Sequence, residues 1–307
     1  MPYINVDEAY ILDNTGLQVD NSVDYANANS NRNLIDNSFF TINQRGFTSG
    51  TRSSGEYVAD RWRAQGTSTA GYSMTANGLR VDASSISSDS ATVLQRLSLQ
   101  SLVGKVVTLS AIVGSTVHSA SAIVPEITAD NTTIIKLVAS SAANVYLLGY
   151  PEGSYDYNYV VQLRSIQGYI PTYRAVKLEI GEYSTLINDV APNYGEELLK
   201  CMRYFQRLNT DTSNYSVFAN GYGWDASNIY ALVPTPVPLR ALPSSAVYSG
   251  TFSGKGGGAS KAITGVSPIS LQTNGITLAF ESSGLTSNEA YTVTALSGAY
   301  IDLSADL

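Results

Sequence analysis

The chain has little of the chemistry on which most enzymes depend. Its 307 residues include one histidine and one cysteine, and only 14% of them are charged. The lone cysteine, Cys201, excludes an internal disulfide and a cysteine-based zinc site, and we expect it to be buried as a small apolar side chain. The lone histidine, His118, lies among small residues in GSTVHSASA, where a structural role is commoner than a catalytic one. We therefore expect a protein that is not an enzyme.

Long apolar runs and basic charge are scarce as well. No apolar run reaches the roughly eighteen residues that a transmembrane helix needs, and the acidic opening MPYINVDEAYILDN lacks the basic leader of a signal peptide. The net charge of -7 gives no broad basic surface for a phosphate backbone. We expect no membrane insertion, no conventional secretion signal and no nucleic-acid partner.

Strand-forming sequence is abundant in residues 33–190. Short runs rich in β-branched and aromatic residues, such as VVTLSAIVG, TTIIKLVAS and YNYVVQLRSI, are separated by Gly, Ser and Asn. This pattern predicts a mainly β protein whose first domain is an antiparallel jelly-roll β-sandwich. In the run RAVKLEI, the alternation predicts that Val176, Leu178 and Ile180 face the core. Lys177 and Glu179 should then face solvent.

The period of the apolar residues changes after Pro192. From Tyr194 to Leu208, apolar residues recur at spacings of three or four, acidic residues come first and basic residues follow. This pattern predicts one amphipathic helix of about fifteen residues. Strand-like runs return from Ser213 to Leu307. We therefore expect residues 191–307 to form a linking helix and a second, smaller β-rich domain.

Residues 1–32 differ from the rest of the chain. They contain short apolar bursts separated by Asp, Asn and Gly, and they end in an Asn- and Ser-rich run. Such a segment is too short and too polar to build a core of its own. We interpret it as an extended arm that docks to another protein, and a terminus without fixed structure is the alternative.

Several motifs resemble those of one protein family. NLIDNSFF and INQRG in residues 33–46, with YVADRW in residues 57–62, look like the start of the jelly-roll domain of tailed-bacteriophage tail fibre and receptor-binding proteins. KLEIG and the segment from Pro192 to Leu208 are similar to the end of that domain and the helix after it, and the closing AYIDLSADL is similar to C-termini of the group. The resemblance covers residues 33–208 well and the rest weakly.

The resemblance implies a β-sandwich related in shape to carbohydrate-binding modules, carried in several copies on a virion, often as a homotrimer. The partners that it implies are other virion proteins, contacted through residues 1–32, and glycans of the host cell surface. The implied location is the virion, after synthesis in the cytoplasm of the host bacterium. The motifs do not distinguish attachment to the tail from attachment to the head.

Two aromatic clusters among the 21 tyrosines and two tryptophans are candidates for binding. In YDYNY, Tyr155, Tyr157 and Tyr159 alternate and would share one face of a strand. Tyr222 and Trp224 lie at a glycine-rich turn in NGYGWD, with Tyr230 close behind. Flat aromatic rings can stack on sugars while their polar groups form hydrogen bonds. The alternatives are a subunit interface for the tyrosines and a core position for Trp224.

Two carboxylates are candidates for a structural calcium. Asp36 lies in the opening motif and Glu179 in the last expected strand of the sandwich, and calcium prefers such oxygen ligands. The family resemblance favours this site, because jelly-roll sugar-binding modules often hold calcium where the first and last strands meet. The alternative is ordinary hydrogen bonding at turns and strand ends. We expect no other cofactor.

Three functions fit these features. The first is a non-enzymatic tail fibre or receptor-binding subunit that contacts host glycans. The second is a head fibre or capsid decoration protein whose tyrosines form subunit contacts. The third, which we favour least, is a glycan depolymerase, whose two carboxyl groups would lie about 5 to 9.5 Å apart. No spacing in the sequence singles out such a pair.

Overall fold

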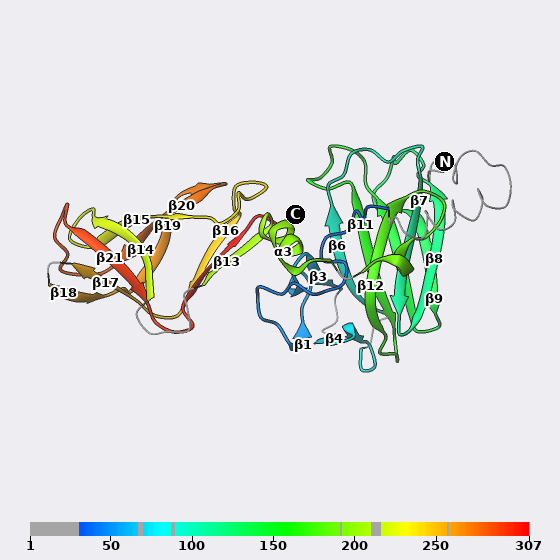
Figure 1. Cartoon of the computed structure of the whole chain (residues 1–307), viewed down its shortest axis with the longest axis horizontal. Helices are drawn as coiled ribbons and strands as arrows, with labels where there is room; N and C mark the ends of the chain where they lie inside the picture. The colour runs from blue at the N-terminus through cyan, green and yellow to red at the C-terminus, as the bar shows by residue number, and fades with distance from the viewer. Residues whose placement is uncertain are drawn as a thin grey trace, which may run out of the picture. The chain divides into compact units, whose positions relative to one another are not determined.

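A computed structural model describes residues 31–66, 70–86, 90–190, 192–209, 216–256 and 258–306. The contacts within the chain divide it into two units, Met1–Tyr194 and Gly195–Leu307 (Figure 1). Antiparallel strands dominate both units, so the prediction of a mainly β protein is confirmed. The arm predicted over residues 1–32 lies, apart from its last two residues, outside the described residues.

Two six-stranded sheets form the first unit (Figure 1, blue to green). In spatial order, the first sheet contains β1 (Ser49–Arg52), β4 (Ala70–Thr75), β5 (Gly78–Asp82), β12 (Thr172–Ile180), β7 (Val106–Val113) and β8 (Thr116–Ile123). The second contains β2 (Tyr57–Ala59), β3 (Trp62–Gln65), β6 (Ser90–Leu97), β11 (Tyr159–Ile166), β10 (Ala143–Gly149) and β9 (Thr132–Ser140). Alternate residues of both sheets share one buried core. The predicted β-sandwich is therefore confirmed, and the more specific jelly-roll arrangement stays a prediction.

Trp62 is one of the largest side chains in this core. Its side chain is completely buried, and the ring of Phe40 packs against it with the centroids 5.2 Å apart. The indole N–H donates to the backbone carbonyl of Asn37 at 2.9 Å. The polar edge of this large buried ring therefore has its hydrogen-bond partner.

The opening motif connects the two sheets by hydrogen bonds. The side chain of Asn33 donates to the carbonyl of Val176 and accepts from the N–H of Leu178, both on β12 of the first sheet. The N–H of Asp36 donates to the side chain of Gln95 on β6 of the second sheet. The amide of Gln95 donates back to the carbonyl of Asp36. One short segment thus binds central strands of both layers.

Asn37 completes this connection. Its fully buried amide donates to the carbonyls of Ile42 and Asp60, each at 2.8 Å, and its oxygen accepts from the N–H of Ile42 at 2.9 Å. Its backbone has a φ of 49°, in the left-handed region that Asn adopts more readily than most residues. Asparagine at this position therefore meets both a conformational and a hydrogen-bonding requirement.

At the end of β12, the burial of the side chains differs from the predicted alternation. Lys177 and Glu179 are completely buried instead of facing solvent, and Ile180 is exposed instead of lying in the core. The chain after β12 covers the polar pair. The Lys177 ammonium lies 2.7 Å from the carboxylate of Asp189, and Glu179 accepts two hydrogen bonds from Thr185. Alternation cannot reveal such a cover, because the covering residues lie beyond the strand.

The second unit also contains two antiparallel sheets, which share one core (Figure 1, green-yellow to red). The three-stranded sheet contains β13 (Phe205–Asn209), β22 (Tyr300–Ser304) and β16 (Ser245–Ser249). The seven-stranded sheet contains β18 (Ala259–Ala262), β17 (Phe252–Gly256), β21 (Ala290–Ala295), β14 (Ser216–Gly223), β15 (Asn228–Pro234), β20 (Gly275–Glu281) and β19 (Gly265–Gln272).

The predicted helix is present but shorter than expected. Helix α3 spans Tyr194–Met202, and a 3-10 helix, η1 (Leu186–Asn188), precedes it. Cys201 is buried, as predicted. The residues after α3 form β13, which pairs residue by residue with the C-terminal strand β22. That partner lies about a hundred residues away in the sequence, so local spacing could not reveal it. No helix among the described residues has the length and apolarity of a membrane span.

Replacing Asn37 tests the connection between the sheets. Asn37→Ala leaves two carbonyls and one N–H buried without their partners, and each such group costs about 1 to 3 kcal/mol. We expect the free energy of unfolding of the first unit to fall by roughly 3 to 6 kcal/mol, measured by urea denaturation. Asn77→Ala, at an exposed turn, is the matched control and should change stability by less than about 0.5 kcal/mol. Equal stability of the two variants would contradict this role.

Candidate functional site

An aromatic cluster lies on the outer face of the seven-stranded sheet of the second unit. Tyr222 on β14 and Tyr230 on β15 are direct cross-strand partners, so their side chains project to the same face. Trp224 follows Tyr222 by two residues, at the start of the turn between these strands, and alternation places it on that face as well. We call these three residues the aromatic platform.

The rings of the platform are close together, and two of the three are exposed to solvent. Trp224 and Tyr230 are stacked, with centroids 5.2 Å apart and ring planes 1° apart. Tyr222 meets each of them edge-on at a centroid distance of 6.4 Å. Trp224 is 55% exposed and Tyr222 is 43% exposed. Large aromatic side chains are usually mostly buried, so this exposed cluster is a candidate for ligand contact.

Hydrogen bonds fix the turn that carries the platform. The N–H of Trp224 donates to the carbonyl of Asn228 at 2.9 Å. The carboxylate of Asp225 accepts from the N–H of Ser227 at 2.7 Å and from the side-chain amide of Asn228 at 3.1 Å. These bonds, the one from Ser227 above all, lower the pKa of Asp225 below its ordinary value. The carboxylate therefore stays ionised at neutral pH, and the turn is preorganised.

The glycine between Tyr222 and Trp224 has a packing role. A Cβ atom on Gly223 would lie 2.3 Å from the carbonyl oxygen of Thr286, so a larger residue would push the turn away from that loop. Polar groups border the rings on the same face. Asn220, two residues before Tyr222, is exposed and accepts a hydrogen bond from the hydroxyl of Thr292 at 3.1 Å. The platform thus combines flat apolar surface with hydrogen-bonding groups at its edge.

The tyrosines of YDYNY do not share one face, which corrects that prediction. The strand begins only at Tyr159, and the residues before it form a loop. Tyr159 is 2% exposed, lies in the sandwich core, and accepts a hydrogen bond from the N–H of Leu102 at 2.9 Å. A ligand therefore cannot reach it. Tyr155 and Tyr157 stack on each other outside that core, with centroids 5.1 Å apart.

Tyr155 and Tyr157 already have partners within the first unit. The hydroxyl of Tyr155 donates to Asp130 at 2.6 Å, which raises the pKa of Tyr155 above its ordinary value. The guanidinium of Arg96 lies 4.5 Å from the ring centroid of Tyr157, and the ring of Tyr150 meets both tyrosines edge-on. Tyr155 is 46% exposed, but its hydroxyl and the ring of Tyr157 are already engaged in these contacts.

The two carboxylates predicted to bind calcium have separate basic neighbours. The carboxylate of Asp36 lies 3.4 Å from Arg61, and that of Glu179 lies 3.7 Å from Lys177. Among the described residues, no group of three or more His, Cys, Asp or Glu side chains is placed to hold a metal ion. Both carboxylates therefore have the hydrogen-bonding and ionic roles that were the alternative, and calcium binding stays a prediction.

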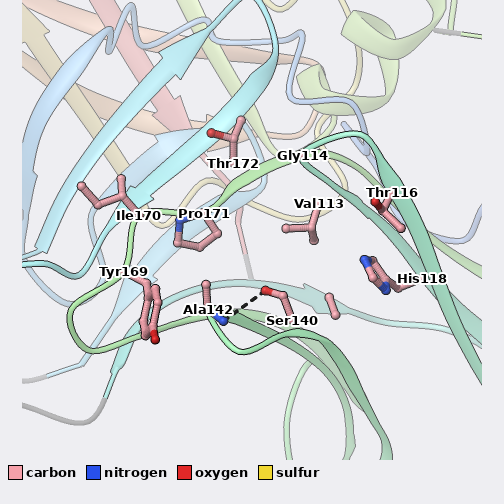
Figure 2. Close-up of a pocket in the computed structure, with 11 residues that line it drawn as sticks. Val113, Gly114, Thr116, His118, Ser140, Ala142, Tyr169, Ile170, Pro171 and Thr172 are labelled. Carbon is pink, nitrogen blue, oxygen red and sulfur yellow. Dashed lines mark hydrogen bonds between the residues drawn. The ribbon is translucent and has the colours of Figure 1, made fainter.

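The lone histidine lines a pocket of about 590 Å³ in the first unit. Figure 2 shows the imidazole of His118 on one side of this pocket and Tyr169 on the other. The hydroxyl of Ser140 accepts a hydrogen bond from the N–H of Ala142 at 3.1 Å. No acidic side chain is among the described residues that line the pocket. The pocket thus gives His118 no carboxylate partner that would orient it as a base.

Comparisons with protein-family models, with curated proteins and with solved structures found no match. The likeness to tailed-phage appendage proteins therefore rests on the sequence motifs alone. Function has to be inferred from the exposed chemistry of the chain, and the aromatic platform is its most distinct feature. The structure brings together Tyr222, Trp224 and Tyr230, which the sequence placed around one turn.

Sequence reasoning missed one group of basic side chains, of which Lys136 is exposed and the other three are half-buried. Arg63, Arg96, Lys136 and Arg164 project from the same sheet face of the first unit. They come from four strands, and which strands are neighbours depends on the topology of the sheet. The sequence did contain one indication of this group. In β9 and β11, a basic residue lies between two residues that face the core, so alternation places it on the outer face.

Iodide quenching of fluorescence tests the exposure of the platform. The chain has two tryptophans, of which Trp62 is completely buried and Trp224 is mostly exposed. We expect iodide to quench one emission component of the folded protein and to leave the other almost unchanged. Trp224→Phe should remove the quenchable component and shift the remaining emission to shorter wavelength. Retention of the quenchable component in this variant would contradict the assignment.

Proposed function

We propose that this protein is a non-enzymatic carbohydrate-binding component of a phage virion, a tail fibre or receptor-binding subunit. The observation that carries the binding proposal is the pair of parallel, stacked rings of Trp224 and Tyr230 on a fixed turn, with Trp224 exposed to solvent. The C–H face of a sugar ring is flat and apolar, so stacking on these rings removes apolar surface of both partners from water.

The surroundings of the platform suit binding better than cleavage. The amide of Asn220, the hydroxyl of Thr292 and the platform hydroxyls can form hydrogen bonds with sugar hydroxyls. Asp225 is held ionised by donors from the turn, so it is poorly suited to be the proton donor that glycoside cleavage requires. A shallow site of this kind is expected to bind one sugar chain weakly.

Assembly would compensate for weak individual sites. In a homotrimer, binding of one copy raises the effective concentration of the glycan at the other copies, which increases the overall affinity. The motifs that resemble tail fibre and receptor-binding proteins support placement on a virion, and residues 1–32 are proposed to dock there. Host cell-surface glycans are the proposed ligands.

One feature is compatible with the second candidate, a head fibre or capsid decoration protein, as well as with the first. After β12, the chain of the first unit exposes several large apolar side chains, namely Tyr183, Ile187, Val190 and, at the start of α3, Tyr194. Exposed apolar surface of this kind is typical of contacts between proteins. Such contacts serve a trimeric fibre equally well, so labelling of purified virions, at the tail or at the capsid shell, distinguishes the two candidates.

Binding to an array of bacterial surface polysaccharides tests the proposed function. We expect the purified protein to bind at least one polysaccharide, and Trp224→Ala to weaken that binding by at least tenfold because the stacking surface is lost. Tyr248→Ala is the matched control, since it removes an exposed tyrosine from β16 in the same unit, and it should bind like the original protein.

Three outcomes would contradict the proposal. They are an absence of binding across the array, equal binding by the Trp224→Ala and Tyr248→Ala variants at equal oligomeric state, and release of reducing ends from the bound polysaccharide. The last outcome would instead indicate the third candidate, a depolymerase. Circular dichroism spectra of both variants establish that each is folded.

A further inference from the structure

The second sheet of the first unit presents a continuous row of side chains on its outer face. Cross-strand pairing links Arg63 on β3, Leu94 on β6, Gln162 on β11, Tyr146 on β10 and Lys136 on β9. Direct partners project to the same face, so this row crosses five neighbouring strands. At the usual strand spacing it is about 19 Å wide. Such a surface is wide enough for several units of a polymeric ligand.

A groove of about 650 Å³ lies along this face. Its lining is mostly polar and includes Gln65, Thr92, Asn131, Tyr146, Gln162 and Arg164. The side chain of Gln162 donates to that of Gln65 at 3.0 Å, which orients both amides. Amides, hydroxyls and one aromatic ring are the groups that recognise sugars.

Positive charge is concentrated on this face, although the chain has a net charge of -7. The basic residues that project from it are Arg63, Arg96, Lys136 and Arg164. Three rows of cross-strand partners run over this face, one through each of Leu94, Thr92 and Arg96. None of the residues paired in these rows is acidic. Asp130, near the stacked tyrosines, accepts a hydrogen bond from Tyr155. The face is therefore suited to a negatively charged ligand.

Two of the cations lie near the ring of Tyr146. The guanidinium carbon of Arg164 lies 4.8 Å from the ring centroid, and the ammonium of Lys136 lies 5.9 Å from it. The Nε of Arg164 is buried and has no hydrogen-bond partner among the described residues. A buried donor without an acceptor is costly, so a turn of the side chain that brought this N–H to an oxygen of an anionic ligand would be favoured.

Arg96 adds to the positive potential on the other side of the groove. Its guanidinium packs on the ring of Tyr157. Burial, followed by the positive charge of Arg63, lowers the pKa of Arg96 below its ordinary value. The two guanidinium groups thus repel each other, and an anion bound nearby would reduce that repulsion.

We propose that this face, the basic groove, binds a polysaccharide whose sugars carry carboxylate groups. Arg164 holds one carboxylate through its planar set of donors. Tyr146 stacks on a sugar ring, and Gln65 and Gln162 form hydrogen bonds with sugar hydroxyls. Lys136 attracts a neighbouring carboxylate. The basic groove lies in the first unit, so it does not depend on sugar binding by the aromatic platform of the second.

A carboxylated sugar chain fits the basic groove better than a nucleic acid does. The net negative charge of the protein opposes a densely charged phosphate backbone. The cations are spread among amides and hydroxyls instead of forming a continuous track. That spacing suits a polymer in which carboxylates alternate with many hydroxyl groups.

Binding of acidic polysaccharides to the full-length protein tests this proposal. The probes are polygalacturonate, alginate, hyaluronan and polysialic acid, each compared with its carboxyl-reduced neutral form. We expect at least one acidic probe to bind at least tenfold more tightly than its neutral form, and we expect its affinity to fall as salt is raised. Arg164→Gln should weaken that binding at least tenfold, and Lys136→Gln, at an exposed position, at least threefold.

Two variants serve as controls. Arg174→Gln removes an exposed arginine from β12 in the other sheet of the same unit, and its binding should be unchanged. Trp224→Ala removes the aromatic platform and should also leave this binding unchanged, which separates failure of the basic groove from failure of the proposed function. Thermal unfolding of each variant establishes that it is folded. If Arg164→Gln does not fold, the affinity of Lys136→Gln decides the outcome.

The proposal is overturned if every acidic probe binds no more tightly than its neutral form. It is also overturned if Arg174→Gln weakens binding as much as the groove variants do. Single-stranded DNA that binds as tightly as the best polysaccharide, and loses affinity in Lys136→Gln, would identify a nucleic-acid surface instead.

Discussion

The hydrogen bonds of two asparagines in one short segment hold the sandwich of the first unit together. Asn33 binds β12 in one sheet, while Asn37 binds the carbonyl of Asp60 beside β3 of the other and offers its own carbonyl to the indole of Trp62. Hydrophobic burial favours packing of the two sheets but is non-directional. Directional bonds to defined backbone groups supply the specificity. The opening motif is thus a structural requirement of the fold, whatever ligand the protein binds.

The inner faces of the sheets form the two cores, so ligands can be recognised only on the outer faces. In the second unit, the outer face of the hairpin β14–β15 carries stacked rings on a turn that Asp225 stabilises. In the first unit, the outer face of β6, β11, β10 and β9 carries Arg164 and Tyr146 in a polar groove. Strand alternation produces both surfaces, because each inward-facing core residue is followed by an outward-facing one. A rigid sheet also limits the entropy lost when such side chains bind a ligand.

Local patterns in the sequence predicted the β character, the sandwich and the neighbourhood of Tyr222 and Trp224. These features depend on residues that are close in the sequence. The errors involve distant partners. Phe205 continues into a strand because its partner, β22, is at the other end of the chain, and Lys177 is buried because later residues cover it. Tyr159 differs from Tyr155 because the strand begins only at Tyr159. The basic groove could not be predicted, since strand order is not a local property.

The central claim, that sugars stack on the exposed rings of the second unit, can be tested by nuclear magnetic resonance. The spectrum of the labelled protein should contain two indole N–H signals, one from Trp62 in its bond to Asn37 and one from the exposed Trp224. Titration with fragments of a polysaccharide that the protein retains should shift the Trp224 signal to saturation and leave the Trp62 signal in place. A retained glycan that leaves the Trp224 signal unmoved would contradict the account.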